Sequence, residues 1–464
     1  MSACASSPLS APRAPWLARL GEAMRRHRGV IIGLQWAVLV AYLVLVVTPA
    51  FLPLPAAGAH LWDDLTLFAQ FAFWGIWWPF VLLSMLFMGR VWCGVLCPEG
   101  FISEQASRVG LGRPVPRWLK WGGWPFIAFI ATTVYGQLVS VYEYAQAALV
   151  VLGGSTVAAI AVGLVYGRGK RVWCRHLCPV SGVFGLLARF APVHFRTDRA
   201  RWEAAGAPAV PVNCAPLVDL RRMESAAPCH MCGRCSGHRD AIQLSTRAPG
   251  AELARLDADD VDRWEVRLLV FGLIGTAIGA FQWSASPWFV RAKLALAEWL
   301  IERDHFALLG DDIPWWLLTH YPQANDVFTW LDGLMILAYI GTAAVVVGGW
   351  VSLWLQLAGR LLGTPRAHLR LAYALVPLAG IGLFLGLSGL TVTLLGAEGV
   401  AIPQLALVRA ALLALGTAGS LWLLATLVGN SAGATRAARL AAMGAATIAV
   451  AGAVLPWVVM YFVW

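Results

Sequence analysis

The chain carries few charged residues for its length. Asp, Glu, Lys and Arg make up 13% of its 464 residues, against roughly 25% in soluble domains. Hydrophobic residues make up 59%, and the mean hydropathy is +0.68. This composition excludes a soluble globular protein and indicates a protein that crosses a membrane several times. We attribute the formal net charge of +10 to basic residues that flank membrane spans, so no nucleic-acid partner is expected.

Long charge-free runs predict where the membrane spans lie. A run of about 20 residues or more can cross a bilayer as a helix and is too long for a barrel strand. The runs are 30–52, 65–88, 121–142, 144–167, 268–290, 333–359, 371–396, 410–429 and 441–464. We therefore predict an all-α polytopic membrane protein with about nine transmembrane helices. The first run has no small-residue cleavage pattern after it, so we interpret it as a span rather than a signal peptide.

Basic residues are concentrated in alternate loops, which predicts the orientation. Lys and Arg are enriched in the cytoplasmic loops of membrane proteins. The five basic segments contain Arg19, Arg25, Arg26 and Arg28; Arg108, Arg113, Arg117 and Lys120; Arg168, Lys170, Arg171 and Arg175; Arg360, Arg366 and Arg370; and Arg436 and Arg439. We predict a multi-pass protein of the bacterial inner (cytoplasmic) membrane, with its N-terminus in the cytoplasm and its C-terminus outside.

Cysteine is also scarce, and eight of the nine cysteines fall in motifs. Residues 90–98 read Arg-Val-Trp-Cys-Gly-Val-Leu-Cys-Pro, and residues 171–179 read Arg-Val-Trp-Cys-Arg-His-Leu-Cys-Pro. Each copy follows a predicted two-helix hairpin, which indicates a duplicated four-helix module whose halves run in parallel. The cysteines of the two motifs are Cys93, Cys97, Cys174 and Cys178.

A third cysteine group lies in the one long polar segment, residues 190–266. It contains Cys229, Cys232 and Cys235. The Cys-x-x-Cys-x-x-Cys spacing is typical of iron–sulfur proteins, and ferredoxins place a fourth cysteine next. Arg239 stands at that position instead, so a cluster here needs a remote ligand, and Cys214 is the candidate. Cytoplasmic cysteines stay reduced, which disfavours structural disulfides.

The sequence leaves alternatives open for both kinds of cysteine group. In the polar segment, the alternatives to a cluster are zinc bound with His230 or His238 and cysteines without a ligand role. In the twin motifs, cysteines four residues apart share one helical face, and the following prolines end or start that turn. Their four thiolates form one site for an iron–sulfur cluster or a copper ion, act as thiol pairs, or merely pack helix ends.

These features divide the chain into four parts. We predict a cytoplasmic N-terminal segment at 1–29 and a duplicated four-helix membrane module at 30–189. A cytoplasmic ferredoxin-type iron–sulfur domain follows at 190–266, and a five-helix membrane module without cysteine at 267–464.

With these motifs the sequence resembles the membrane polyferredoxins of the NapH, NosR and CcoG type. Their signature is two Cys-x-x-x-Cys-Pro motifs at cytoplasmic helix ends followed by a ferredoxin-type cysteine segment, and the resemblance covers residues 30–245. These relatives usually carry two complete ferredoxin motifs, whereas this chain has one and the distant Cys214. The cysteine-free C-terminal bundle resembles FtrD, the polyferredoxin of a bacterial ferrous-iron uptake system. The resemblance implies at least one [4Fe–4S] cluster, with a second candidate centre at the twin motifs.

The expected function is therefore electron transfer by a carrier rather than catalysis by a stand-alone enzyme, and no catalytic residue is predicted. The resemblance implies that electrons pass between cytoplasmic or membrane donors and an extracytoplasmic cupredoxin or reductase, with a permease as a further partner, in ferrous-iron uptake. The alternatives are a respiratory quinol-linked carrier, a metal-reducing assembly factor and a permease subunit. Histidines avoid the span centres, which disfavours a b-type haem, and charges avoid them too, which disfavours a permease.

Overall fold

The computed structural model describes residues 15–464 except 57, 206–210, 258 and 432. It is 69% helical, and the prediction of an all-α polytopic fold is confirmed. Eight helical segments of the described chain are long and apolar enough to cross a membrane. They are Arg28–Phe51, Leu65–Met88, Ala145–Tyr166, Arg263–Ala285, Trp330–Leu362, Ala367–Ala397, Leu405–Gly429 and Arg436–Val463.

The ninth predicted run, 121–142, forms a shorter helix than its hydropathy suggests. Helix α7 covers Trp124–Leu138, 15 residues, which at 1.5 Å per residue is roughly 22 Å long. The hydrocarbon core of a bilayer is about 30 Å thick. Two glycines precede the helix, and Ser140 adopts a left-handed conformation with φ of 49° just after it. The run is apolar throughout, but its backbone leaves the helix at both ends.

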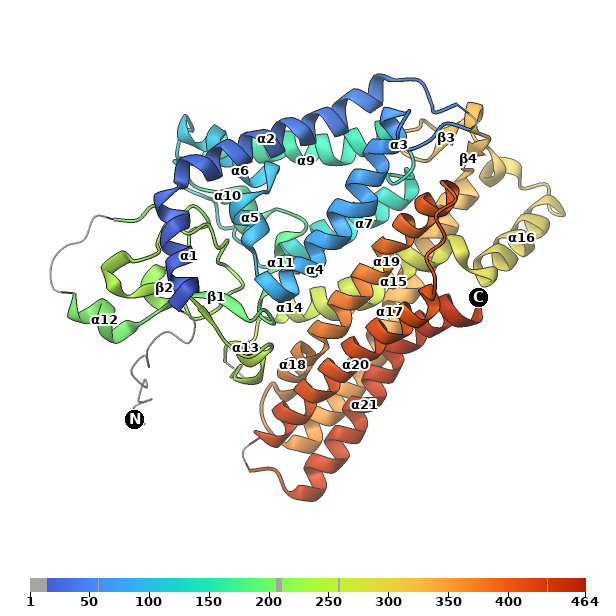
Figure 1. Ribbon diagram of the computed structural model, residues 1–464. Coiled ribbons are helices and arrows are strands. Elements are labelled where there is room, and N and C mark those ends of the chain that lie inside the picture. Colours follow the sequence, from blue (N-terminus) through green and yellow to red (C-terminus); the bar gives the residue numbers. More distant parts are fainter. Residues whose placement is uncertain (1–14, 57, 206–210, 258, 432) are drawn as a thin grey trace. The chain divides into compact units, whose positions relative to one another are not determined.

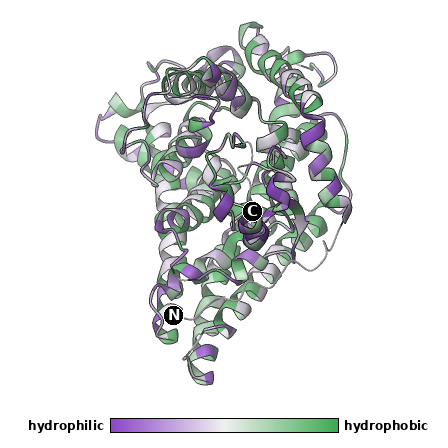
Figure 2. Ribbon diagram, turned by 90° about the vertical axis from the view of Figure 1, so that its left-hand side faces the viewer, coloured by the Kyte–Doolittle hydropathy of each residue, from purple (hydrophilic) through white to green (hydrophobic). Residues whose placement is uncertain are grey.

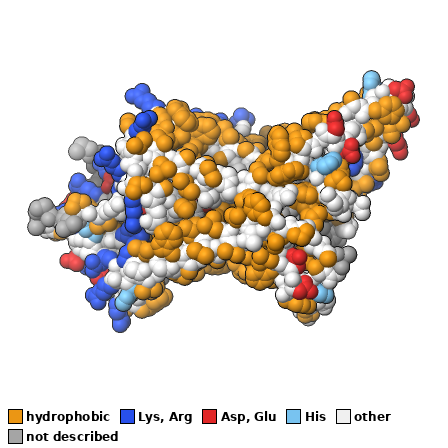
Figure 3. Space-filling view, turned by 90° about the horizontal axis from the view of Figure 1, so that it is seen from above, with side chains coloured by type: hydrophobic (Ala, Val, Ile, Leu, Met, Phe, Trp, Pro, Cys, Tyr) orange, Lys and Arg blue, Asp and Glu red, His pale blue; other side chains and the backbone are white. Residues whose placement is uncertain are grey.

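Side chains on the long helices are suited to lipid. Val345, Leu353 and Leu415 are 68%, 62% and 66% exposed, which a water-soluble protein rarely tolerates in such numbers. Much of the helical ribbon is green, the colour of hydrophobic residues (Figure 2). On the face drawn in Figure 3 they cover much of the surface, while Lys and Arg gather in one area. The structure therefore describes a multi-pass membrane protein.

The chain divides into two compact units that interleave along the sequence. Unit 1 contains residues 1–41, 84–120 and 156–252, and unit 2 contains residues 42–83, 121–155 and 253–464. All eight motif cysteines belong to unit 1. The helical hairpins that lead into the cysteine motifs therefore contribute to both units.

Unit 1 carries short elements around the cysteine motifs (Figure 1). Two antiparallel strands pair Val193 with Thr246 and Thr197 with Ile242, and α1 packs against β2. The elements are α1 (Pro15–Arg26), the first part of α2 (Arg28–Val47), the end of α4 (Trp78–Met88), α5 (Val91–Val95), α6 (Pro98–Arg108), most of α9 (Gly154–Tyr166), α10 (Val172–His176), α11 (Ser181–Ala188), β1 (Val193–Thr197), α12 (Arg199–Ala204) and β2 (Ile242–Thr246).

Unit 2 is built around long helices. Helix α17 packs along α21 and against the π-helical segment η6, and α19 packs along α20 and against the π-helical segment η2. The principal elements are α3 (Leu65–Gln70), η2 (Phe71–Trp77), α7, α8 (Ala145–Ala148), η3 (Leu149–Gly153), α14 (Arg263–Arg267), η6 (Leu268–Thr276), α15 (Ala277–Gln282), α16 (Pro287–Ile301), β3 (His320–Tyr321), β4 (Asp326–Val327), α17 (Trp330–Leu362), α18 (Ala367–Ala372), α19 (Val376–Ala397), α20 (Leu405–Gly429) and α21 (Arg436–Val458).

A seam of small residues packs α6 against the C-terminal end of α9. On α6, Ser103 and Ser107 are fully buried. On the facing chain, a Cβ at Gly163 would lie 2.5 Å from the Ser103 carbonyl oxygen, and one at Gly167 would overlap Ser107. Small residues four apart on both helices let backbones approach closely, the usual packing device inside membranes. This seam holds the helix that follows the first cysteine motif against the helix that leads to the second.

We predict that Gly163→Ala lowers stability, because its methyl group has no room beside the Ser103 carbonyl. Overpacking of this kind costs about 1–3 kcal/mol. Thermal unfolding in detergent should show a lower midpoint. Gly154→Ala on the same helix is the matched control, because nothing lies within 4 Å of its Cβ position and alanine is the better helix former. Equal midpoints for the two variants would contradict the tight seam.

Candidate metal centre

The two copies of the repeated motif adopt the same local structure. Each forms a five-residue helix, α5 or α10, that contains the first cysteine and ends just before the second. The backbone N–H of Cys97 donates to the Trp92 carbonyl at 2.9 Å, and that of Cys178 donates to the Trp173 carbonyl at 3.0 Å. The copies then differ, because Pro98 begins α6 directly while Pro179 lies in a turn before α11. The similar sequences of the two motifs therefore form the same short helix and turn up to the second cysteine.

One sulfur from each motif lies beside Gly100. A Cβ placed on this glycine would lie 3.5 Å from both Cys97 Sγ and Cys174 Sγ. Twice that distance, 7.0 Å, is therefore the most that can separate these two sulfurs. The backbone N–H of Gly100 also donates to Cys97 Sγ at 3.3 Å. Because Gly100 has no side chain, the space between Cys97 Sγ and Cys174 Sγ stays open, although these cysteines lie 77 positions apart in the sequence.

The four cysteines of the twin motifs, which we call the membrane-edge centre, sit in a dry environment. Cys174 and Cys178 pack with Trp173 and with Ala159 of α9 in one apolar cluster. Burial raises the pKa of Cys174 to about 12, and burial followed by repulsion from Cys93 and Cys174 raises the pKa of Cys97. Thiols of this kind carry protons at neutral pH unless a metal binds them, so loading the centre releases protons.

Two buried arginines link the copies by reaching across to the opposite motif. Arg90, which begins the first copy, donates to Ser181 Oγ at 2.9 Å, and Ser181 in turn donates to the Cys174 carbonyl at 2.6 Å. Arg171, which begins the second copy, donates to the Cys93 carbonyl. Both arginines are almost completely buried, at 4% and 1% exposure. Arg171 thus bonds the first motif directly, while Arg90 reaches the second through Ser181 and also donates to the Ala227 carbonyl at 2.7 Å.

Arg171 also belongs to a buried charge network. Its Nε donates to Glu104 at 2.8 Å, and Arg234, from the cysteine-rich polar segment, donates to the other oxygen of the same carboxylate. Burial alone would raise the pKa of Glu104, but the two guanidinium groups outweigh it and lower the pKa. One carboxylate therefore faces two cations, which leaves net positive charge beside the thiolates.

The loop of Cys229, Cys232 and Cys235 has the backbone of an anion-binding nest. Met231 and Gly233 adopt left-handed conformations, with φ of 50° and 74°. Residues of alternating handedness turn successive N–H groups toward one concavity, as in many iron–sulfur sites. The Met231 N–H donates to Cys229 Sγ at 3.4 Å. The backbone thus contributes donors to the same side as the thiolates.

Cys214 joins this loop although it lies 15 positions upstream of Cys229. Burial, together with repulsion from Cys232 and Cys214, raises the pKa of Cys229 to about 12. Lys170 donates to the Cys214 carbonyl at 3.1 Å, and the Arg171 N–H donates to the neighbouring Ala215 carbonyl at 2.8 Å. We call Cys214, Cys229, Cys232 and Cys235 the loop centre.

Arg239, at the position where a ferredoxin has its fourth cysteine, makes other contacts. Its guanidinium lies 5.3 Å from the centre of the Trp202 ring and donates to the Ala205 carbonyl. Within the described part of the chain, no group of three or more His, Cys, Asp or Glu side chains is arranged so that it could hold a metal ion.

Both groups of four cysteines have features that suit an iron–sulfur cluster. Each offers four cysteines, which are the preferred cluster ligands, and each has a backbone N–H directed at a sulfur. Arg171 Nη2 and Arg90 Nε are buried and have no hydrogen-bond partner among the described residues. Such donors are rare in proteins and suit a bound group with negative charge.

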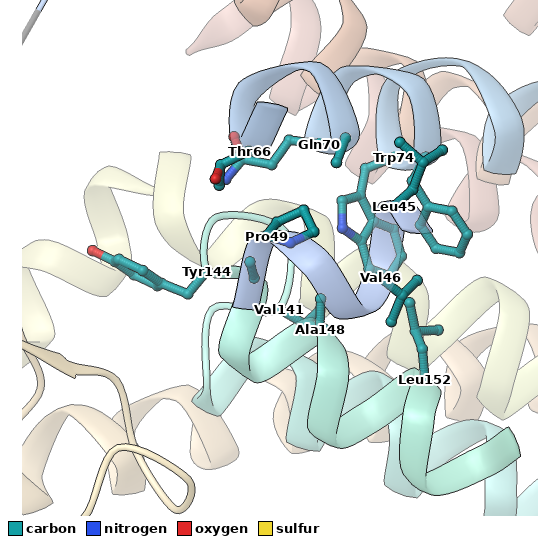
Figure 4. A pocket seen from close by; sticks show the side chains of 13 residues that line it. Leu45, Val46, Pro49, Thr66, Gln70, Trp74, Val141, Tyr144, Ala148 and Leu152 are labelled. Carbon is teal, nitrogen blue, oxygen red and sulfur yellow. The ribbon is translucent and has the colours of Figure 1, made fainter. Parts of the chain in front are cut away.

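A separate cleft lies in unit 2, where the two π-helical segments η2 and η3 begin (Figure 4). It encloses about 320 Å³, part of it open to the outside, and is mainly apolar. Its polar side chains include Thr66, whose buried hydroxyl has no partner among the described residues, and Gln70. Gln70 donates to the Glu143 carbonyl. π-Helical turns are frequent at functional sites, but the cleft contains no cysteine.

Comparison with known proteins supports the cysteine chemistry. The family model of a 4Fe-4S binding domain matches residues 70–120 and 150–197, so that each segment contains one copy of the twin motif. This match supports the expected resemblance to membrane polyferredoxins. It also confirms the iron–sulfur cofactor expected from the sequence.

The curated relatives match this chain only in part. The putative electron transport protein YccM of Escherichia coli (strain K12) is 25% identical over 229 residues, 43% of this chain and 62% of the relative. The methylamine utilization ferredoxin-type protein MauN of Paracoccus denitrificans is 30% identical over 125 residues, 24% of this chain and 44% of the relative. The chain therefore spans less than two thirds of either relative. No solved structure matches it.

Sequence reasoning missed the residues that support the motif cysteines. We counted Arg171 among the basic residues of a cytoplasmic loop, but it is buried between the motifs. The signal was present, because both copies of the repeat begin with arginine. Glu104 and Gly100 gave no signal, since nothing in the sequence pairs them with the second copy. The eight predicted cysteine ligands remain predictions, although the structure brings them together as two groups of four.

We predict that Glu104→Gln strongly destabilises the protein. The variant leaves Arg171 and Arg234 buried without a carboxylate, and breaking a buried ion pair in this way costs about 3–5 kcal/mol. Thermal unfolding in detergent should show a large drop in the midpoint. The control is Glu22→Gln on α1, whose partners Arg25 and Arg26 are exposed, because exposed ion pairs contribute little. Comparable losses in both variants would contradict the buried network.

Proposed function

We propose that the protein is an electron conduit that holds two iron–sulfur clusters at the cytoplasmic face of the bacterial inner membrane. In this proposal the loop centre holds a [4Fe–4S] cluster and the membrane-edge centre holds a second cluster. The observation that carries the proposal is the gathering of eight buried or partly buried cysteines into two groups of four. A bound cluster supplies reversible one-electron chemistry.

The residues of the chain have distinct tasks in this proposal. The cysteines supply the ligands, and Trp173 and the apolar cluster around it keep water away from the membrane-edge centre. Arg171 and Arg90 compensate negative charge, which favours the reduced state of a nearby cluster because reduction adds an electron. Hydrogen bonds to the sulfurs and exclusion of solvent are further means by which a protein sets the potential of a cluster. The N–H groups of Gly100 and Met231 act in this way.

The partners and the direction are the finer part of the proposal. We infer that electrons pass between a cytoplasmic or membrane donor and an extracytoplasmic cupredoxin or reductase, with a permease as a further partner, in ferrous-iron uptake. The basic loops support a cytoplasmic N-terminus, and the cysteine-free helices after residue 267 support the resemblance to FtrD. The relatives YccM and MauN are named for electron transport and methylamine utilization. Those names favour electron transfer over transport by this chain itself.

We predict that protein purified without oxygen contains iron and acid-labile sulfide and little zinc. Two [4Fe–4S] clusters would give about eight atoms of each per chain. Metal analysis and sulfide determination measure this directly. Stoichiometric zinc without sulfide would refute the conduit, and about four atoms of each would leave one centre without a cluster.

We predict that Cys178→Ser removes electron transfer but spares the loop centre. The four cysteines act as a unit, so the double variant Cys97→Ser/Cys178→Ser should be no worse than the single one. The readout is the rate at which the chemically reduced protein bleaches an oxidised cupredoxin, with electron paramagnetic resonance (EPR) to follow the loop centre. Cys4→Ser, at the one cysteine outside the motifs, is the control. A Cys178→Ser protein that folds and transfers electrons at the normal rate would show that these cysteines only pack.

A further inference from the structure

The first cysteine motif touches the loop centre through a glycine. Gly94 follows Cys93, and a Cβ placed on it would overlap the His230 carbonyl and lie 2.8 Å from the Cys232 backbone nitrogen. The backbone of Gly94, between Cys93 and Cys97, therefore packs directly against the backbone of the loop at His230 and Cys232. No side chain other than hydrogen fits at this point.

The contact is held from both sides. Gln35 on α2 is completely buried and donates to the Gly94 carbonyl at 3.0 Å. His230 is 2% exposed, so the loop has no solvent gap on its side of the contact. The position of Gly94 is therefore fixed by packing and by a hydrogen bond, which is what a constant separation between two centres requires.

A second connection runs beside the first. Arg171 donates to the Cys93 carbonyl and to Glu104, and Glu104 accepts from Arg234, which lies between Cys232 and Cys235 in the loop. This chain of hydrogen bonds leads from the backbone of one centre to the loop of the other. The two centres are consequently joined by hydrogen-bonded protein groups.

The two copies of the motif differ at this position. The residue that corresponds to Gly94 in the second copy is Arg175, and its side chain is exposed. An arginine cannot replace Gly94 against the loop, and Arg175 does not need to be small because it faces outward. Of the two positions at which the motifs differ, this one accounts for the first copy lying against the loop centre.

We propose that Gly94 is the crossing point for electrons between the two clusters. The proposal rests on the proposed function, because it needs a cluster in each centre. One electron leaves one cluster, which is oxidised, and enters the other, which is reduced; no bond forms or breaks and no proton moves. An external one-electron reductant supplies the first electron. Gly94 is a positioning residue, since its role is to let the centres approach.

The unaltered protein provides the first test. With both clusters fully reduced by dithionite, the two spins should interact, so the EPR spectrum should be split or broadened relative to the sum of the two separate cluster spectra. A spectrum that is a plain sum, in protein with the iron and sulfide of two clusters, would overturn the crossing at Gly94. Iron and sulfide for fewer than two clusters would instead refute the proposed function.

Gly94→Ala provides the second test, because its methyl group must push the loop away. We expect weaker spin interaction and a rate of electron exchange between the clusters that is lower by at least tenfold, with iron and sulfide unchanged. Gly33→Ala on α2 is the matched control, since nothing lies within 4 Å of its Cβ position. A Gly94→Ala protein with two clusters and normal exchange would overturn the proposal. If this variant loses iron, the spectrum of the unaltered protein decides alone.

Discussion

Negative charge buried at a membrane edge is the constraint on which the structure of unit 1 depends. Four thiolates in an apolar environment are unfavourable unless positive charge and N–H donors surround them. The chain meets this need with Arg90 and Arg171, which take no part in binding lipid or solvent because they are buried. Glu104 then limits the excess of positive charge by facing Arg171 and Arg234 together. The same buried arginines and Glu104 therefore stabilise the fold and provide the positive charge that a cluster in the proposed centre needs.

The duplication explains how this balance is built from one short motif. Each copy supplies a turn, two cysteines and a leading arginine, and each arginine serves the other copy. The copies have nonetheless diverged where their surroundings differ. Gly94 lies against the cysteine loop and Arg175 is exposed, while Pro98 starts a helix and Pro179 does not. The features that the two copies share therefore build the membrane-edge centre. The difference between Gly94 and Arg175 allows only the first copy to pack against the loop centre.

Hydropathy was sufficient to predict the membrane fold, because a helix in lipid must satisfy its own backbone and so needs a long apolar run. It overestimated one span, since the run 121–142 is apolar but its ends leave the helix at Gly123 and Ser140. Cysteine spacing was sufficient to group the candidate ligands, because clusters demand thiolates at short intervals. It could not reveal Glu104, Gly100 or Gln35, whose roles arise only when distant segments pack. Burial of one arginine among many basic residues likewise has no signature in a single sequence.

The exchange of arginines between the two motifs also sets an order of events during synthesis. When the ribosome has produced the first motif, the Cys93 carbonyl lacks its donor, and Cys97 lacks the sulfur that faces it across Gly100, because Arg171 and Cys174 are still to be made. The membrane-edge centre can therefore be completed only after the second hairpin has entered the bilayer. The loop that rests on Gly94 emerges later still. The contacts that complete the membrane-edge centre therefore form only in a chain that already contains both motifs.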